Sequence, residues 1–179
     1  MTEVLYTSRW NPLTGRPAMK HRWLPEDEAR RAFESGSGII TIVDAATRGD
    51  GDVPRPRWVI GAGAKGRVRV QFFTPGGAVW RQIDYDDIDG RLWRWICITY
   101  VYPDDQTRYM RLQATRILTE EFRPDGTGRV KDDSKLEPNV DAYTLTNAPV
   151  GAFWMDRPDF GNWEGLTNPE YGVPSRCGR

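Results

Sequence analysis

Between residues 58 and 130 the sequence alternates apolar and polar side chains, and turn residues interrupt it at nearly even spacing. In RVRVQFF, residues 67–73, the apolar Val68, Val70 and Phe72 alternate with polar neighbours, the period of a strand with one buried face. The turn sequences TPGG, DDIDG, PDDQ and PDG follow, with no helical pattern between them. Strands joined directly by short turns pair antiparallel. The sequence therefore predicts an antiparallel β-meander over residues 58–130.

One helix and one further strand precede the predicted meander. Pro25 opens the sequence PEDEARRAFES, three acids follow it at the positive end of a helix dipole, and Gly36 comes directly after it. These signals predict a helix over residues 24–35. The apolar, β-branched sequence GIITIVDAA at residues 38–46 predicts a buried strand that ends at Asp44.

Two less regular segments complete the chain. Proline and glycine interrupt residues 1–22, for which we expect an extended arm with a short strand at 3–7. Residues 147–179 are rich in Gly, Pro and Asn but also in aromatic side chains, which predicts an irregular tail packed against the sheet. Since 179 residues are the length of one domain, we expect a single domain, residues 1–179. Its predicted fold class is α+β and β-rich: an antiparallel meander sheet of about six to eight strands, one N-terminal helix and an irregular aromatic C-terminal tail.

The composition of the sequence disfavours several classes of protein function. No stretch approaches eighteen apolar residues and the N-terminus lacks the layout of a secretory signal, so we expect a cytoplasmic protein with no membrane partner. The formal net charge is zero, which disfavours a nucleic-acid partner although arginine alternates with aromatic residues in RLWRW. One histidine, His21, and two separated cysteines, Cys97 and Cys177, offer little to a metal ion, so we expect no metal site.

A glycine motif stands between the first two strands of the predicted meander. Gly61, Gly63, Gly66 and Val68 match G-x-G-x-x-G-x-V. Dinucleotide binding requires a helix after the glycines, because the helix N-terminus receives the pyrophosphate, and here a strand follows. A protein kinase also needs a strand lysine and an H-R-D loop, and only eighteen residues follow the DFG at 159–161. We therefore expect no nucleotide cofactor.

The motif still predicts a loop with little side-chain bulk between two strands. Such a loop can adopt positive φ and enter a narrow space, or it can be a plain hairpin connection. Arginine and lysine flank it, and no acid occurs between residues 53 and 83. The candidate partner-binding residues are Gly61, Gly63, Ala64, Lys65, Gly66, Arg67 and Arg69.

The sequence lacks the combinations of residues that enzymes usually use for catalysis. A nucleophile such as Cys97 needs a base, and His21 lies in an arm rich in proline and arginine. The four aspartates of DYDDIDG lack the glutamate that a calcium loop places six residues after its glycine. We therefore expect no catalytic residues and no enzymatic activity.

Eight Trp and many Arg in a β-rich domain without catalytic groups favour a protein that binds another protein, because these residue types are enriched at binding hot spots. In length, β-rich middle and glycine loop, the chain resembles bacterial toxin-immunity proteins, in particular the immunity factor of the tuberculosis necrotizing toxin, which cleaves NAD.

The resemblance implies a protein that neutralises a cognate toxin by occluding its active site. The loop over residues 61–66 would enter the NAD site, and Lys65, Arg67 and Arg69 would meet its acidic rim or the position of the phosphates. The alternative is a small-ligand-binding β-barrel or sheet module that holds an apolar ligand between Trp80, Trp93 and Trp95.

Overall fold

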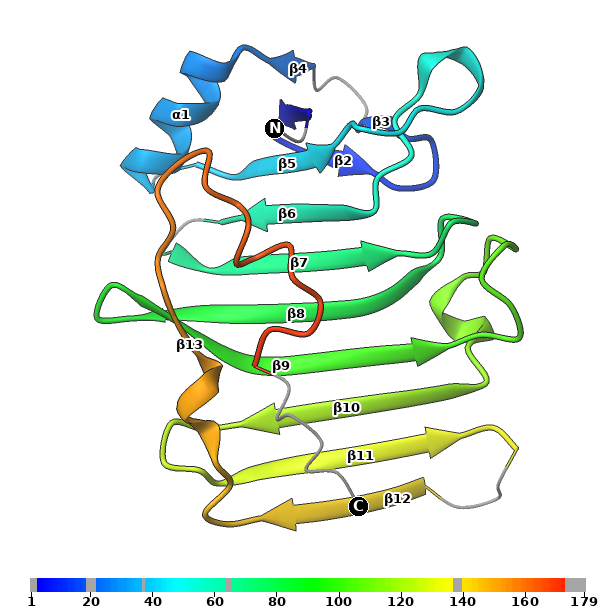
Figure 1. The fold of residues 1–179 in the computed structure, drawn as a ribbon, viewed down its shortest axis with the longest axis vertical. Helices are drawn as coiled ribbons and strands as arrows, with labels where there is room; N and C mark the ends of the chain where they lie inside the picture. Colours follow the sequence, from blue (N-terminus) through cyan, green and yellow to red (C-terminus); the bar gives the residue numbers. More distant parts are fainter. Residues whose placement is uncertain (1–2, 19–21, 37, 64–65, 137–139, 173–179) are drawn as a thin grey trace.

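The computed structural model describes residues 3–18, 22–36, 38–63, 66–136 and 140–172. Its main feature is an eleven-stranded sheet in which β12, β11, β10, β9, β8, β7, β6, β5, β1 and β4 lie in this order and β13 pairs with β9 (Figure 1). The strands are β1 Val4–Thr7, β4 Trp23–Leu24, β5 Ile40–Asp44, β6 Trp58–Ala62, β7 Val68–Phe73, β8 Val79–Ile88, β9 Arg91–Val101, β10 Arg116–Phe122, β11 Gly128–Ser134, β12 Val140–Leu145 and β13 Trp154–Asp156. A separate two-stranded hairpin joins β2 Trp10–Asn11 to β3 Arg16–Pro17.

The predicted β-rich α+β class and the antiparallel sheet are confirmed, and every strand pair of the main sheet is antiparallel. The expected size of about six to eight strands is wrong, because strands outside residues 58–130 join the sheet at both edges. β5, β1 and β4 extend one edge, and β12 extends the other. The 147–179 segment is also less irregular than expected, since it contains the 3-10 turn η4 Val150–Phe153 as well as β13.

The helix α1 spans Glu26–Ser35. Pro25 precedes it with an extended backbone, so Leu24 belongs to β4 and the helix begins two residues later than predicted. Gly36 ends it in the left-handed conformation at φ +60°, and its N–H donates to the Phe33 carbonyl. Ala29 and Phe33, one turn apart, are the buried residues of α1.

One face of the sheet is covered by α1 and by the chain that follows β13. That chain runs along the face to α1 and returns to β9 (Figure 1). Phe160 stacks on Tyr6 of β1 at 5.2 Å between ring centroids, and Trp163 meets the edge of Phe33 at 5.3 Å. The main core lies between these layers, and the opposite face of β7 and β8 is therefore where polar side chains are found.

Candidate binding face

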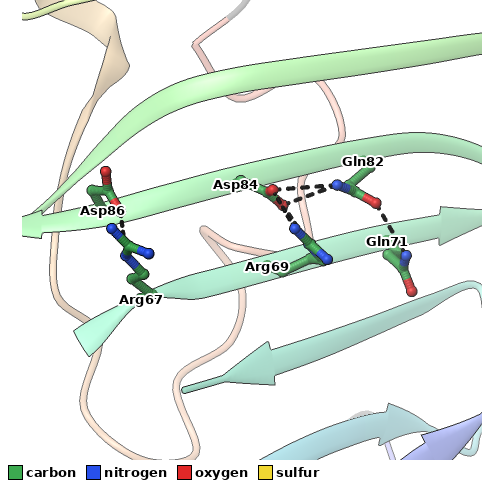
Figure 2. Close-up of polar contacts among 6 residues, drawn as sticks. All are labelled: Arg67, Arg69, Gln71, Gln82, Asp84 and Asp86. Carbon is green, nitrogen blue, oxygen red and sulfur yellow. Dashed lines mark hydrogen bonds and ion pairs between the residues drawn. The ribbon is translucent and has the colours of Figure 1, made fainter. Parts of the chain in front are cut away.

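The first part of the candidate site is a set of polar side chains on the face of β7 and β8 opposite the core. Because side chains alternate along a strand, Val68 and Val70 enter the core while Arg69 and Gln71 project from the other face. We call six residues the polar row (Figure 2): Arg67, Arg69, Gln71, Gln82, Asp84 and Asp86.

Cross-strand register brings the members of the polar row together. Arg69 is directly opposite Asp84, and its Nε and Nη2 donate to the two carboxylate oxygens, each at 2.7 Å. Gln82 donates to the same carboxylate at 3.2 Å and accepts from Gln71 at 3.2 Å. Arg67 Nε lies 2.9 Å from Asp86 Oδ1. The row therefore consists of one network that joins Arg69, Asp84, Gln82 and Gln71 and of a separate Arg67–Asp86 ion pair beside it (Figure 2).

The carboxylate groups of the polar row are more buried than its guanidinium groups. The side chain of Asp84 is 9% exposed, whereas those of Arg69 and Arg67 are 57% and 75% exposed. The hydrogen bonds to Asp84 raise the pKa of Arg69 above its ordinary value, so its charge is held fixed. The face thus presents to solvent two exposed arginines, each paired with an aspartate of β8.

A shallow cavity of about 480 Å³ adjoins the polar row. Its wall includes Trp10 of the β2–β3 hairpin, and its floor includes Gly61, Arg69 and Gln71 of β6 and β7. Trp10 packs on the cluster of Val43, Val59 and Phe73, which places the hairpin on the same face as the row. Trp10 was not among the candidate residues, and only the fold brings it next to Arg69, because it lies 59 positions earlier in the chain.

The structure places the predicted loop residues in two groups. Gly61 lies within β6, opposite Thr41 on one side and Arg69 on the other, and so belongs to the face with Arg67 and Arg69. Gly63 and Gly66 lie in the connection between β6 and β7, where Gly63 N donates to the Arg67 carbonyl at 2.8 Å. The predicted strand–loop–strand arrangement is present. Ala64 and Lys65 lie outside the described residues.

A residue of the C-terminal segment fixes one end of this connection. Nη1 of Arg157 donates to the Gly66 carbonyl at 3.1 Å and to Asp87 Oδ2 at 2.8 Å. The guanidinium also lies 5.3 Å from the centroid of the Phe33 ring. The loop end at Gly66 is consequently less free than the sequence suggested. No local signal could have revealed this contact, since Arg157 is 91 positions from Gly66.

The three tryptophans of the alternative ligand site do not share a cavity in the part of the chain that the structure describes. Trp93 is 2% exposed, packs against Phe153 and donates from Nε1 to the Phe122 carbonyl at 3.1 Å. Trp80 packs against Phe72 in a different cluster, and Trp95 is 38% exposed. The barrel form of that alternative is wrong, because the sheet ends at β4 and β12.

Comparisons with protein-family models, curated proteins and solved structures returned no match to this chain. Over the described ranges, no group of three or more His, Cys, Asp or Glu side chains could hold a metal ion. The helices of that part are also too short or too polar to cross a membrane. The geometry of the binding face is therefore the basis for a functional proposal.

Proposed function

We propose that the protein is an immunity factor that binds a cognate bacterial toxin and occludes its active site. The polar row and the adjoining β6–β7 connection form the contact surface. The observation that carries this proposal is the pair of exposed arginines, Arg67 and Arg69, each held in position by a carboxylate of β8. Oriented cations lose little side-chain entropy on binding.

The surroundings of the row support a protein as the partner. Arginine and tryptophan are the residue types most enriched at binding hot spots, and Trp10 lies at the same cavity as Arg69. A carboxylate-rich rim around the active site of a toxin would be complementary to the two arginines. The expectation of an NAD-cleaving partner comes from the resemblance described above.

The proposal is tested with a toxin encoded beside the gene of this protein. We expect a stable complex and loss of toxin activity on mixing. The double variant Arg67→Gln/Arg69→Gln should weaken inhibition by about tenfold or more, as loss of hot-spot side chains does. Arg129→Gln is the matched control, because Arg129 is an exposed strand arginine on β11, three strands away from β8 in the sheet order. An equal effect of both variants, or no complex with unaltered protein, would overturn the proposal.

A second variant tests the loop. A Cβ at Gly63 would lie 3.8 Å from the Arg67 carbonyl, an ordinary contact, so the backbone there leaves room for a Cβ. Gly63→Trp should therefore block entry of the connection into a toxin cleft while leaving the unfolding transition unchanged. Unaltered inhibition by this variant would remove the loop from the contact surface.

A further inference from the structure

A concavity lies at one end of the sheet, where four connections meet. It has a volume of about 870 Å³, and we call it the end groove. Its walls are the β2–β3 hairpin, the β5–β6 connection, the β7–β8 turn and the β9–β10 connection. The residues that line it are Trp10, Pro12, Leu13, Thr14, Gly15, Thr47, Gly49, Val53, Pro54, Arg55, Pro56, Arg57, Phe73, Thr74, Pro75, Gly76, Gly77, Gln106 and Arg108.

The walls of the end groove are tied to one another. Gly76 N in the β7–β8 turn donates to the Asp105 carbonyl at 2.8 Å, and a Cβ at Gly76 would lie 2.3 Å from the Gln106 carbonyl. The guanidinium of Arg108 donates to the Pro12 carbonyl and joins the β9–β10 connection to the hairpin. Phe73 N donates to the Arg57 carbonyl at 2.8 Å. The groove is therefore preformed, and a ligand need not order it.

Its surface mixes apolar and polar groups, with somewhat more apolar than polar area. Four prolines and two aromatic side chains line it, and Leu13 at the tip of the hairpin is 63% exposed. Grooves lined by aromatic side chains hold extended peptides in several recognition domains.

The charge of the end groove is positive. Arg55, Arg57 and Arg108 line it, and among the described residues no aspartate or glutamate does. Arg57 is paired with Asp44, whose side chain is fully buried, at 2.8 Å. Arg55 is exposed, and no ion pair to a described acid is found for it. Asp104 and Asp105 of the β9–β10 connection are not among the lining residues: the Asp104 carboxylate turns to Thr107 and Tyr109, and that of Asp105 to Gln106.

The backbone argues against a phosphate group as the natural ligand. Phosphate sites use several free backbone N–H groups in succession. Here Pro54, Pro56 and Pro75 have no N–H to offer, and the amides of Gly76 and Gly77 already donate to the Asp105 and Thr74 carbonyls. Carboxylates carried on an apolar, extended chain match both the arginines and the proline surface.

We propose that the end groove binds an extended acidic segment of a protein partner. Trp10 and Pro12 line both this groove and the cavity beside the polar row, so one partner can cover the two surfaces. The inference rests on the proposed function only in taking the partner to be a protein. It holds whether or not that partner is a toxin.

The test uses fluorescein-labelled decapeptides in which Asp alternates with Leu, or Lys alternates with Leu. Fluorescence anisotropy should show binding of the Asp peptide and none of the Lys peptide. Arg55→Glu should weaken binding of the Asp peptide by about tenfold, because it replaces a cation of the groove with an anion. Arg129→Glu is the control and should leave both results unchanged, and thermal unfolding checks that each variant is folded.

Several outcomes would overturn this inference. They are equal binding of the two peptides, no binding of the Asp peptide at millimolar protein, and loss of binding in Arg129→Glu equal to that in Arg55→Glu. Displacement of the Asp peptide by pyrophosphate at the same concentration as by unlabelled peptide would show a small-anion site instead. Peptide binding measured without any toxin keeps this test separate from the proposed function. If the Asp peptide does not bind and the Arg67→Gln/Arg69→Gln variant still loses inhibition, the inference about the end groove is overturned and the proposed function is retained.

Discussion

Nη1 of Arg157 lies 2.8 Å from the Asp87 carboxylate and joins the C-terminal segment to β8. The two side chains are 26% and 21% exposed, so most of the pair is removed from water. The same guanidinium donates to the Gly66 carbonyl. This contact couples the covering layer of the sheet to the end of the β6–β7 connection.

Replacing Arg157 by Met should lower the free energy of unfolding by about 1–3 kcal/mol, because it leaves a mostly buried carboxylate and a carbonyl without their donor. Urea denaturation measures the change. Arg31→Met is the matched control, since the Arg31–Asp27 pair on α1 is 3.0 Å long but 74% and 72% exposed. Its loss should cost at most about 0.5 kcal/mol. Equal costs for the two variants would contradict the importance of the Arg157 contact.

Gly66 and Gly61 should respond differently to substitution by alanine. Gly66 has φ +76°, and a Cβ there would lie 2.6 Å from Asp87 Cβ, so Gly66→Ala should destabilise the protein by about 1–2 kcal/mol or more. A Cβ at Gly61 would meet nothing closer than the Arg69 carbonyl at 3.9 Å, and Gly61→Ala should be nearly neutral. Thermal unfolding of the two variants side by side checks the difference, and the reverse order would contradict the backbone geometry.

Asp132 of β11 should titrate below the ordinary range of an aspartate. The hydrogen bond from Arg116 lowers the pKa of its carboxyl. A lowered pKa in the folded state means stability that is present above the unfolded pKa and is lost as the pH falls through the folded one. A carboxyl-detected NMR titration should show the low pKa, and Arg116→Met should move it upward. If the pKa of Asp132 did not rise in Arg116→Met, the hydrogen bond from Arg116 would not be the cause of the low pKa. Asp132→Asn should make the free energy of unfolding depend less on pH in the acidic range.

The edge strand β12 should be the least protected strand of the sheet. All six of its residues are exposed, and one of its two sides lies at the edge of the sheet. Central strands such as β8 and β9 are paired on both sides and carry buried residues. Hydrogen exchange should therefore be about a hundredfold or more faster for the amides of residues 140–145 than for those of 81–85. Comparable protection would indicate that another chain covers this edge.

Local patterns were sufficient for part of the candidate site. The alternation in RVRVQFF predicted that Arg67 and Arg69 lie on the wet face of a strand; Arg69 does, and Arg67 is exposed directly before β7 begins at Val68. The partners of these arginines were not predicted. The pairing of Arg69 with Asp84 depends on the register between β7 and β8, which is set by the whole hairpin including the irregularity at Phe72.

The burial of a charged side chain could not be predicted from local sequence patterns either. Arg94 looks from the sequence like one more arginine of RLWRW, yet it is 2% exposed and its Nη1 donates to the Gly172 carbonyl at 2.7 Å. The return of the C-terminal segment to β9 buries it. That return could not be predicted, because residues 157–172 have neither a helical nor a strand period.

By itself, the sequence determined the antiparallel pattern of strands and turns over residues 58–130 and the helix α1, because alternation, proline and glycine act over a few residues. Only the tertiary structure decided that β1, β4 and β5 extend the sheet, that Arg157 holds Gly66, and that loops far apart in the chain enclose the end groove. These contacts join residues separated by tens of positions. Their free energy depends on register and layer packing, which no short window of sequence contains.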